Sequence, residues 1–168
     1  APGARRADWT IHIGIVVRNI ADLTGLMARF ERGSRKDAVL RSGNGDEIAV
    51  EWEWGGVWGN ELPKLRDERK IWRTDKSKML KYAVLITYTH DIDTAYKKVA
   101  EQWQGAPWPL LLILIDVEKV PPKILSSRRK FINIQMSVFD KDGQRELRTA
   151  PALPWKVNGT RWSLKVVT

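Results

Sequence analysis

The sequence predicts an α/β domain with a mixed central β-sheet flanked by helices. Three features indicate this class: an apolar stripe of helical spacing near the N-terminus, a hairpin signal at Asn44-Gly45, and a strand-helix-strand order over residues 82–117. An antiparallel hairpin and a parallel pair joined by a helix together give a sheet of mixed direction. Because we find no internal repeat and no linker long enough to separate two domains, we expect residues 1–168 to form a single domain.

The first expected element is a helix that starts near Ile13 and ends at Gly33. Arg29 and Arg32 would lie in its last turn and Gly33 just beyond it, where basic residues and glycine are favoured. The apolar residues that recur at spacings of three and four are Ile13, Val16, Val17, Ile20, Leu23, Met27 and Phe30.

A β-hairpin is expected next, because two β-rich runs, residues 37–41 and 47–54, flank Asn44-Gly45. If the turn is centred on Asn44, residues equidistant from it face each other and side chains alternate between the two faces. One face is then wholly apolar and should pack on the core. Its residues are Ala38, Leu40, Ile48, Val50, Trp52 and Trp54.

The charged stretch from Asn60 to Lys81 is typical of a helix, with Pro63 in its first turn and an interruption near Thr74-Asp75. Residues 82–89 and 110–117 are predicted to be strands on either side of a helix over 91–104 that Asp91 caps.

Beyond Pro121-Pro122, a strand over 131–139 and two short strands around Asn158-Gly159 are expected. These strands would form a C-terminal β elaboration over about residues 123–168.

The charge of the chain favours a polyanionic partner. Its 29 Lys and Arg residues exceed its 20 Asp and Glu residues and give a net charge of +9, so nucleic acid is the leading partner class. A basic protein kept soluble by its charge, or a membrane-surface binder, stays open. The absence of Cys excludes disulfides, Cys-based zinc sites and thiol catalysis. No apolar run is long enough to span a bilayer, and we expect a cytoplasmic or nucleoid-associated protein that is neither secreted nor membrane-bound.

The second face of the hairpin carries acids that need an explanation. Asp37 would lie opposite Glu51, with Glu53 at the same end and only Arg41 near the turn to neutralise Glu47. Like charges that face each other destabilise a sheet, and a divalent metal ion would relieve the repulsion. The alternative is a solvated face whose acids are paired by Lys and Arg side chains.

Residues 13–117 resemble the restriction-endonuclease-like, or PD-(D/E)XK, nuclease superfamily. Its pattern is a helix, a hairpin with an Asp near the start of one strand and Glu-x-Lys near the end of the next, then a helix and a further strand. Arg35-Lys36-Asp37 stands at the position of the Asp, and Glu51-Trp52-Glu53 at that of Glu-x-Lys. The sequence departs from the family pattern in three ways. No Pro precedes Asp37, the first core strand ahead of the hairpin is not evident, and Glu53 stands in place of the motif Lys.

The resemblance implies a restriction-endonuclease-like core and a nuclease dependent on Mg²⁺ or Mn²⁺, with Asp37 and Glu51 as metal ligands. Glu53 would assist as general base or further ligand, and Glu31, near the end of the first helix, stands where some relatives place another metal-contacting acid. Lys64 or Lys70 could replace the missing motif Lys from the neighbouring helix.

Two basic segments are candidates for phosphate contacts. Trp54, Trp58 and Trp72 lie close in sequence to the candidate acids, and their rings could stack on the bases of a bound nucleic acid. Solvated helix faces and core packing are the alternatives for these cations and tryptophans. The candidate cations are Lys64, Arg66, Arg69, Lys70, Arg73, Lys76, Arg128, Arg129 and Lys130.

The function predicted from the sequence is therefore a metal-dependent nuclease that hydrolyses phosphodiester bonds in DNA. A non-catalytic nucleic-acid-binding domain with a degenerate nuclease fold is the alternative from another class, followed by a protein-interaction domain with a basic face. A homodimer stays open, because dimers are common where both strands of a duplex are cut.

Overall fold

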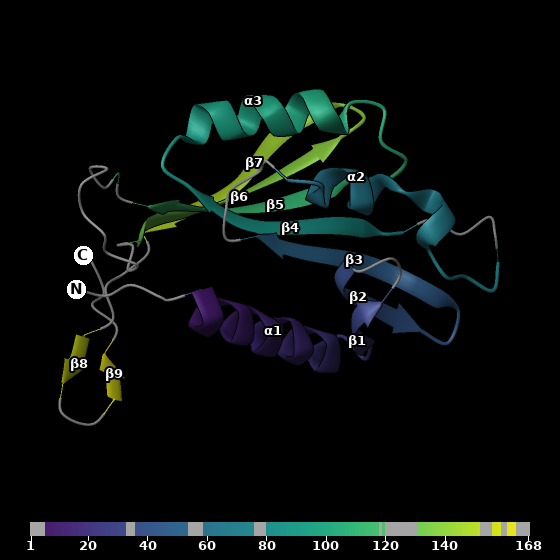
Figure 1. The fold of residues 1–168 in the computed structure, drawn as a ribbon, viewed down its shortest axis with the longest axis horizontal. Coiled ribbons are helices and arrows are strands. Elements are labelled where there is room, and N and C mark those ends of the chain that lie inside the picture. The colour runs from purple at the N-terminus through teal and green to yellow at the C-terminus, as the bar shows by residue number, and fades with distance from the viewer. Residues whose placement is uncertain are drawn as a thin grey trace.

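In the computed structural model, the described elements begin with a helix and three strands, then alternate between helices and strands, and end with five consecutive strands (Figure 1). The elements are α1 (Arg6–Leu23), β1 (Met27–Arg32), β2 (Lys36–Ser42), β3 (Gly45–Glu53), α2 (Glu61–Arg66), the 3-10 helix η1 (Glu68–Lys70), β4 (Tyr82–Thr89), α3 (Ile92–Trp103), β5 (Leu110–Val117), β6 (Phe131–Asp140), β7 (Gly143–Pro151), β8 (Lys156–Asn158) and β9 (Arg161–Ser163). The structure describes residues 6–32, 36–53, 59–75, 80–117, 119, 131–151, 156–158 and 161–163.

Seven strands form one mixed sheet in which each strand lies beside the next one in the chain, from β1 to β7. The β1–β2–β3 and β5–β6–β7 steps are antiparallel, whereas β3, β4 and β5 run parallel. The parallel steps are those that α2 and α3 connect, as parallel strands need a crossover. The expected α/β class with a mixed sheet is confirmed.

Helices cover both faces of the sheet, and each covered face has its own buried core. On one face α1 packs through Trp9, Ile13, Val17 and Ala21. On the other face α2 contributes Leu62 and Leu65, and α3 contributes Val99 and Trp103. Figure 1 shows this division, with α1 on the side of the sheet opposite α2 and α3. The central strands are therefore covered on both sides, which explains their nearly continuous apolar sequences.

The predicted first helix is wrong at both ends, because α1 begins at Arg6 and ends at Leu23. Gly25 adopts a φ of 68°, and the N–H of Leu26 donates to the carbonyl of Ala21 at 2.9 Å, a helix-terminating pattern that glycine favours. Residues 27–32 then form the edge strand β1. Apolar residues at 27 and 30 continued the helical spacing by coincidence and hid this strand.

The predicted hairpin register is confirmed for the strand residues that adjoin Asp37 and Glu51. Ala38 pairs with Val50 and Leu40 with Ile48, as expected for a turn near Asn44, and these apolar residues pack under α1. Trp54, also expected on this face, and Trp58 lie outside the described residues. A bulge after Leu40 then shifts the register.

The pairing expected near the turn is wrong because of this bulge. Arg41 faces Asp46, with its Nη2 atom 2.7 Å from Asp46 Oδ1, instead of neutralising Glu47. Glu47 pairs with Lys81, whose Nζ lies 2.6 Å from Glu47 Oε2.

The long helix expected over residues 60–81 is also wrong. Only six residues form α2, and Asp67, which follows it, accepts a hydrogen bond from the N–H of Arg69 at the start of η1. The chain then extends so that Arg73 forms a bridge with Gly45. The backbone contacts between this charged segment and the β2–β3 turn therefore outweigh its helical preference.

The remaining elements follow the prediction closely. The strands over 82–89 and 110–117 are confirmed as a parallel pair, and the Asp91 carboxylate caps α3 by accepting from the N–H of Thr94 at 3.1 Å. β6 confirms the strand expected at 131, and β7, which was not predicted, pairs with it to extend the main sheet. β8 and β9 confirm the short strands around 158–159 and form a separate pair. Within the described residues, no helix combines the length and the apolar character needed to cross a membrane.

Gly45→Ala should destabilise the fold, whereas Gly43→Ala should not. Gly45 has a φ of 133°, and a Cβ there would lie 2.7 Å from both the Arg73 Cα and the Trp72 carbonyl oxygen; a Cβ at Gly43 would meet open space. We expect Gly45→Ala to cost about 2 kcal/mol and to lower Tm by roughly 4–8 °C in thermal unfolding. Equal Tm values for the two variants would show that the close approach of residue 73 to the turn does not exist in solution.

Candidate functional site

Two neighbouring strands bring the two predicted metal ligands to the same end of the sheet. Asp37 is the second residue of β2, and Glu51 lies near the end of β3, which pairs antiparallel with it. The Asp37 Oδ2 atom accepts a hydrogen bond from the backbone N–H of Trp52 at 2.8 Å. Asp37 is therefore tied to β3 by the main chain, next to Glu51.

Glu51 is a buried carboxylate with one cationic partner among the described residues. Its side chain is 1 % exposed, and it lies on the face of β3 that α2 covers. The Nζ atom of Lys64, on α2, lies 3.1 Å from Glu51 Oε2. The alternative interpretation, a solvated face whose acids are paired by Lys and Arg side chains, is right about the pairing of Glu51 with Lys64 but wrong about the solvation of Glu51. Lys64, one of the two lysines considered as a substitute for the motif Lys, lies next to this acid.

The second carboxylate oxygen of Glu51 has no hydrogen-bond partner among the described residues, although it is buried. Buried polar atoms in native proteins are nearly always paired with protein or water, and an unpaired carboxylate oxygen costs more than a neutral one. The Oε1 atom of Glu51 is therefore a buried acceptor that has no donor among the described residues.

A third acid, Glu61, was not predicted from the sequence. It is the first residue of α2, is 9 % exposed, and precedes Lys64 by three positions, a spacing that places both residues on one side of a helix. This spacing was visible in the sequence. The expectation of a helix over residues 60–81 concealed it, because acids and lysines at such spacings are ordinary on charged helices.

Burial and repulsion make Glu51 an unusually weak acid. Desolvation is the main cause that raises its pKa, the negative charge of Asp37 is the next, and Glu61 adds to them. The hydrogen bond and positive charge of Lys64 lower the pKa, but only partly offset the increase. The resulting pKa of Glu51 is about 7, well above its usual value of 4.5.

The partners of Glu51 are shifted as well. Desolvation raises the pKa of Asp37, the Trp52 hydrogen bond and Lys64 oppose this, and the charges of Glu31 and Glu53 raise it further. Burial lowers the pKa of Lys64, but its bond to Glu51 and the surrounding negative charges outweigh burial and raise it. Lys64 is therefore positively charged at neutral pH.

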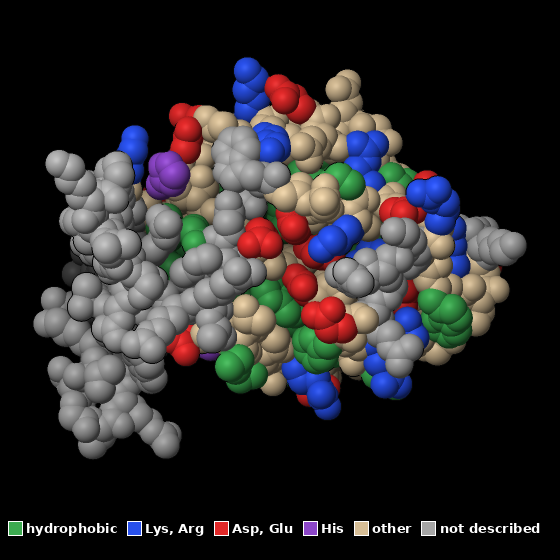
Figure 2. All heavy atoms as spheres, in the orientation of Figure 1, with side chains coloured by type: hydrophobic (Ala, Val, Ile, Leu, Met, Phe, Trp, Pro, Cys, Tyr) green, Lys and Arg blue, Asp and Glu red, His purple; other side chains and the backbone are tan. Residues whose placement is uncertain are grey.

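The other two predicted acids lie at the edge of this cluster. Glu53 is half-buried at the end of β3, where its backbone carbonyl accepts from the Thr87 hydroxyl at 2.9 Å. The expected place of Glu31 at the end of the first helix is wrong, because it is an exposed residue of β1. Its φ of 53° lies in the left-handed region that non-glycine residues rarely adopt. Figure 2 shows acidic side chains gathered around a basic one below α2.

The predicted cationic surface is not one continuous helical face. Arg66 holds the end of α3, because its guanidinium donates to the carbonyls of Gln102 and Gln104. Arg69 is exposed and paired with Asp67 at 3.0 Å, and Lys70 lies in η1. Arg73 forms the bridge to the β2–β3 turn. Lys76, Arg128, Arg129 and Lys130 lie outside the described residues.

Within the described part of the chain, no group of three or more His, Asp or Glu side chains is arranged to hold a metal ion. The comparisons with known proteins returned no match: no family model, no curated protein and no solved structure is similar to this chain. Any assignment of function therefore depends on the geometry and electrostatics of the described residues.

The raised pKa of Glu51 predicts how stability changes with pH. Between pH 4.5 and about 7 the folded protein retains a proton on Glu51 that the unfolded chain has released, so stability falls as pH rises through this window. Glu51→Gln removes this contribution and should exceed the wild type in stability above pH 7, by up to about 3 kcal/mol.

Urea unfolding between about pH 4 and 8, with a chelator present, measures this difference. Glu101→Gln, which changes an exposed acid on α3, is the matched control and should leave the wild-type profile unchanged. Parallel pH profiles for wild type and Glu51→Gln would show that Glu51 ionises as a normal carboxyl.

Proposed function

We propose that this chain is a metal-dependent nuclease that hydrolyses phosphodiester bonds in DNA. The observation that carries the proposal is the buried Glu51 carboxylate, which has Asp37 as a repelling neighbour, Lys64 as its cationic partner, and one oxygen without a hydrogen bond. A carboxylate pair that repels itself in a partly buried site is costly unless a cation joins it, and such arrangements concentrate at functional sites.

The proposal includes a restriction-endonuclease-like core formed by α1 to β4. Two observations support it beyond the sequence motif. β1 supplies a strand ahead of the hairpin, which the sequence did not reveal, and Lys64 supplies a lysine next to the acids, where Glu53 replaces the motif residue. The order of helix, three antiparallel strands, helix and parallel strand is compatible with such a core.

The residues present are compatible with Mg²⁺ or Mn²⁺. Mg²⁺ commonly uses one or two carboxylates together with waters and substrate phosphates, so a protein site need not offer three acids. Asp37 and the open Oε1 atom of Glu51 would hold the ion, and Glu31 and Glu53 would add negative charge beside Asp37. When bound, such an ion polarises the phosphodiester and lowers the pKa of its water.

The protein groups have separate roles in this hydrolysis. Lys64 is charged, so it donates hydrogen bonds and cannot serve as the base; it orients Glu51 and stabilises negative charge on the phosphate. Glu53 would accept the proton of the attacking water. The water oxygen bonds to phosphorus, the bond from phosphorus to the leaving oxygen breaks, and solvent returns a proton to that oxygen.

A non-catalytic nucleic-acid-binding domain is the second candidate, and one observation favours it. Lys64 already neutralises one oxygen of Glu51 without a metal ion, as expected if the acids serve to hold α2 on the sheet. The two candidates differ in what removal of one acid does to activity and to stability.

Asp37→Asn should abolish metal-dependent cleavage and retain DNA binding. The amide oxygen can still accept the Trp52 hydrogen bond, so the fold persists while one charged ligand is lost. Cleavage of end-labelled single-stranded and duplex DNA with Mg²⁺ or Mn²⁺ is the measurement, with Asp93→Asn, on the first turn of α3, as the control. The nuclease proposal fails if the wild type cleaves neither substrate and Asp37→Asn unfolds more easily than wild type without metal.

Lys64→Gln tests the second charged group independently. Loss of a preorganised donor to a developing negative charge typically slows catalysis by about 100- to 1000-fold, and we expect a fall in kcat of this size. Lys97→Gln removes an exposed lysine of α3 and should leave kcat unchanged. An unchanged kcat in Lys64→Gln would assign Lys64 a purely structural role.

A further inference from the structure

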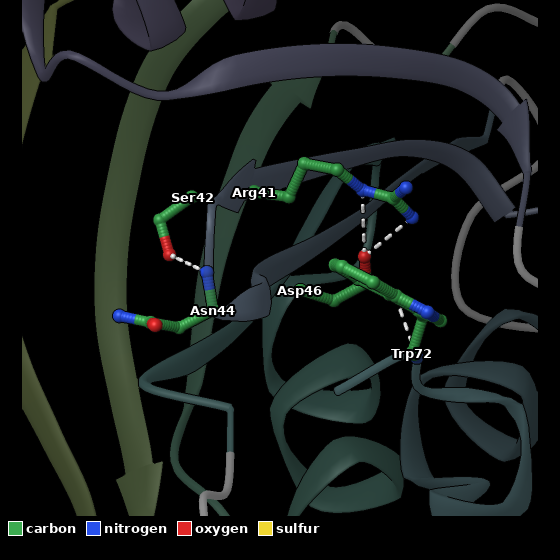
Figure 3. Close-up of polar contacts among 5 residues, drawn as sticks. All are labelled: Arg41, Ser42, Asn44, Asp46 and Trp72. Atoms are coloured by element: carbon green, nitrogen blue, oxygen red, sulfur yellow. Dashed lines mark hydrogen bonds and ion pairs between the residues drawn. The ribbon is translucent and has the colours of Figure 1, made fainter. Parts of the chain in front are cut away.

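A second cluster of polar contacts lies at the other end of β3, where the β2–β3 turn meets the segment after η1. Its centre is the Asp46 carboxylate, whose side chain is 1 % exposed. The Arg41 Nε and Nη2 atoms both donate to Asp46 Oδ1, at 3.0 and 2.7 Å, and the backbone N–H of Trp72 donates to Oδ2 at 3.0 Å. Figure 3 shows these side chains converging, with the Trp72 ring lying beside the Arg41–Asp46 pair.

This cluster fixes the position of Trp72 through its main chain. In addition to the bond to the carboxylate, the Trp72 carbonyl accepts from the N–H of Asp46 at 2.7 Å. Thr74, two residues further along the chain, reinforces the attachment, because it donates through both its N–H and its hydroxyl to the Asn44 carbonyl. Trp72 is therefore held between two contacts that do not involve its side chain.

The indole of Trp72 is supported on one side and open on another. The Arg41 guanidinium carbon lies 4.9 Å from the ring centroid, a cation–π distance, yet Trp72 is 48 % exposed. By contrast Trp9, Trp103 and Trp108 are each at least 96 % buried and belong to the two cores. Trp72 belongs to neither core, and the exposed part of its ring is accessible to a ligand.

We propose that Trp72, supported by Arg41, is a stacking platform for an unpaired base, so that the substrate of this protein includes a single-stranded segment. The inference rests on the proposed nuclease function and specifies its substrate. Aromatic rings bind bases of any sequence through their faces, and a rigid ring loses little entropy on binding. Bases within a duplex already stack on both sides, so an exposed ring selects an unpaired base. Because Asp46 neutralises Arg41, the contact is one of stacking rather than of phosphate attraction.

The platform and the acid cluster are separated along one strand. Glu51 lies five residue steps along β3 from Asp46, which corresponds to about 17 Å. At the spacing of about 3.4 Å per stacked nucleotide, the bound base would lie about five nucleotides from the phosphate at the acids.

The test is the affinity of the full chain, without divalent metal, for an oligothymidylate of about 12 nucleotides, a length suited to one binding groove. Trp72→Ala should weaken binding by about 5- to 150-fold, the equivalent of about 1–3 kcal/mol per stacked base. Trp72→Phe should retain most of the affinity, since it keeps an aromatic face. The backbone contacts with Asp46 do not need the indole, so Tm should stay near the wild-type value.

Two controls distinguish a loss of base stacking from other causes of weaker DNA binding. Tyr82→Ala removes a ring that is 45 % exposed on β4 and should not change the affinity. An abasic strand of the same length and charge should bind wild type and Trp72→Ala equally. Equal losses on the normal and abasic strands, or no loss at all in Trp72→Ala, would overturn the platform.

The outcome is distinguishable from that of the nuclease proposal. If Trp72→Ala loses base-dependent binding but the wild type never cleaves DNA, the platform stands and the nuclease proposal fails. If the wild type cleaves and Trp72→Ala binds single strands and cleaves them equally well, the nuclease proposal stands and the platform fails.

Discussion

The burial of one carboxylate, Glu51, governs the arrangement of the candidate site. A charged group that is 1 % exposed must be compensated, and here the sheet, α2 and the neighbouring strand each contribute to the balance. Lys64 offsets the negative charge on one Glu51 oxygen. Asp37 adds a second negative charge next to Glu51, because the Trp52 N–H holds it there. The short helix α2 has to begin close to the end of β3 to deliver Lys64. The cost of this arrangement in stability is the physical reason to assign it a chemical role.

Much of the fold could be predicted because the relevant signals are local. The Asn-Gly signal located the hairpin, although the turn itself is Gly43-Asn44 because Ser42 pairs with Gly45, and the register beyond the bulge brings Asp37 and Glu51 to one end of the sheet. Capping by Asp91 and the apolar strands around α3 gave the parallel pair. The errors came from non-local contacts. β1 becomes a strand because β2 offers it an edge, and its sequence also has helical spacing. The segment after Arg66 extends because it pairs with the hairpin turn.

The same distinction applies to the site. Asp37 and Glu51 could be found from the register, whereas Lys64 was recognised only as a possible substitute and Glu61 was missed. Their proximity depends on where α2 starts and ends, which a charged sequence does not specify. The Arg41–Asp46–Trp72 cluster was hidden for a related reason, since a bulge of one residue moved Arg41 away from its expected partner. Small irregularities in the backbone thus decide which charges meet.

The most direct test of the central claim, that Asp37 and Glu51 form a divalent-metal site, is calorimetric titration of Mn²⁺ into the full chain. Titrations in two buffers of different ionisation enthalpy count the protons released. At about pH 6 a Glu51 with a pKa of about 7 is largely protonated, so binding of one ion should release a proton. We expect one saturable site per chain, with proton release that disappears in Glu51→Gln. No saturable binding, or binding that Glu51→Gln leaves unchanged, would contradict the claim.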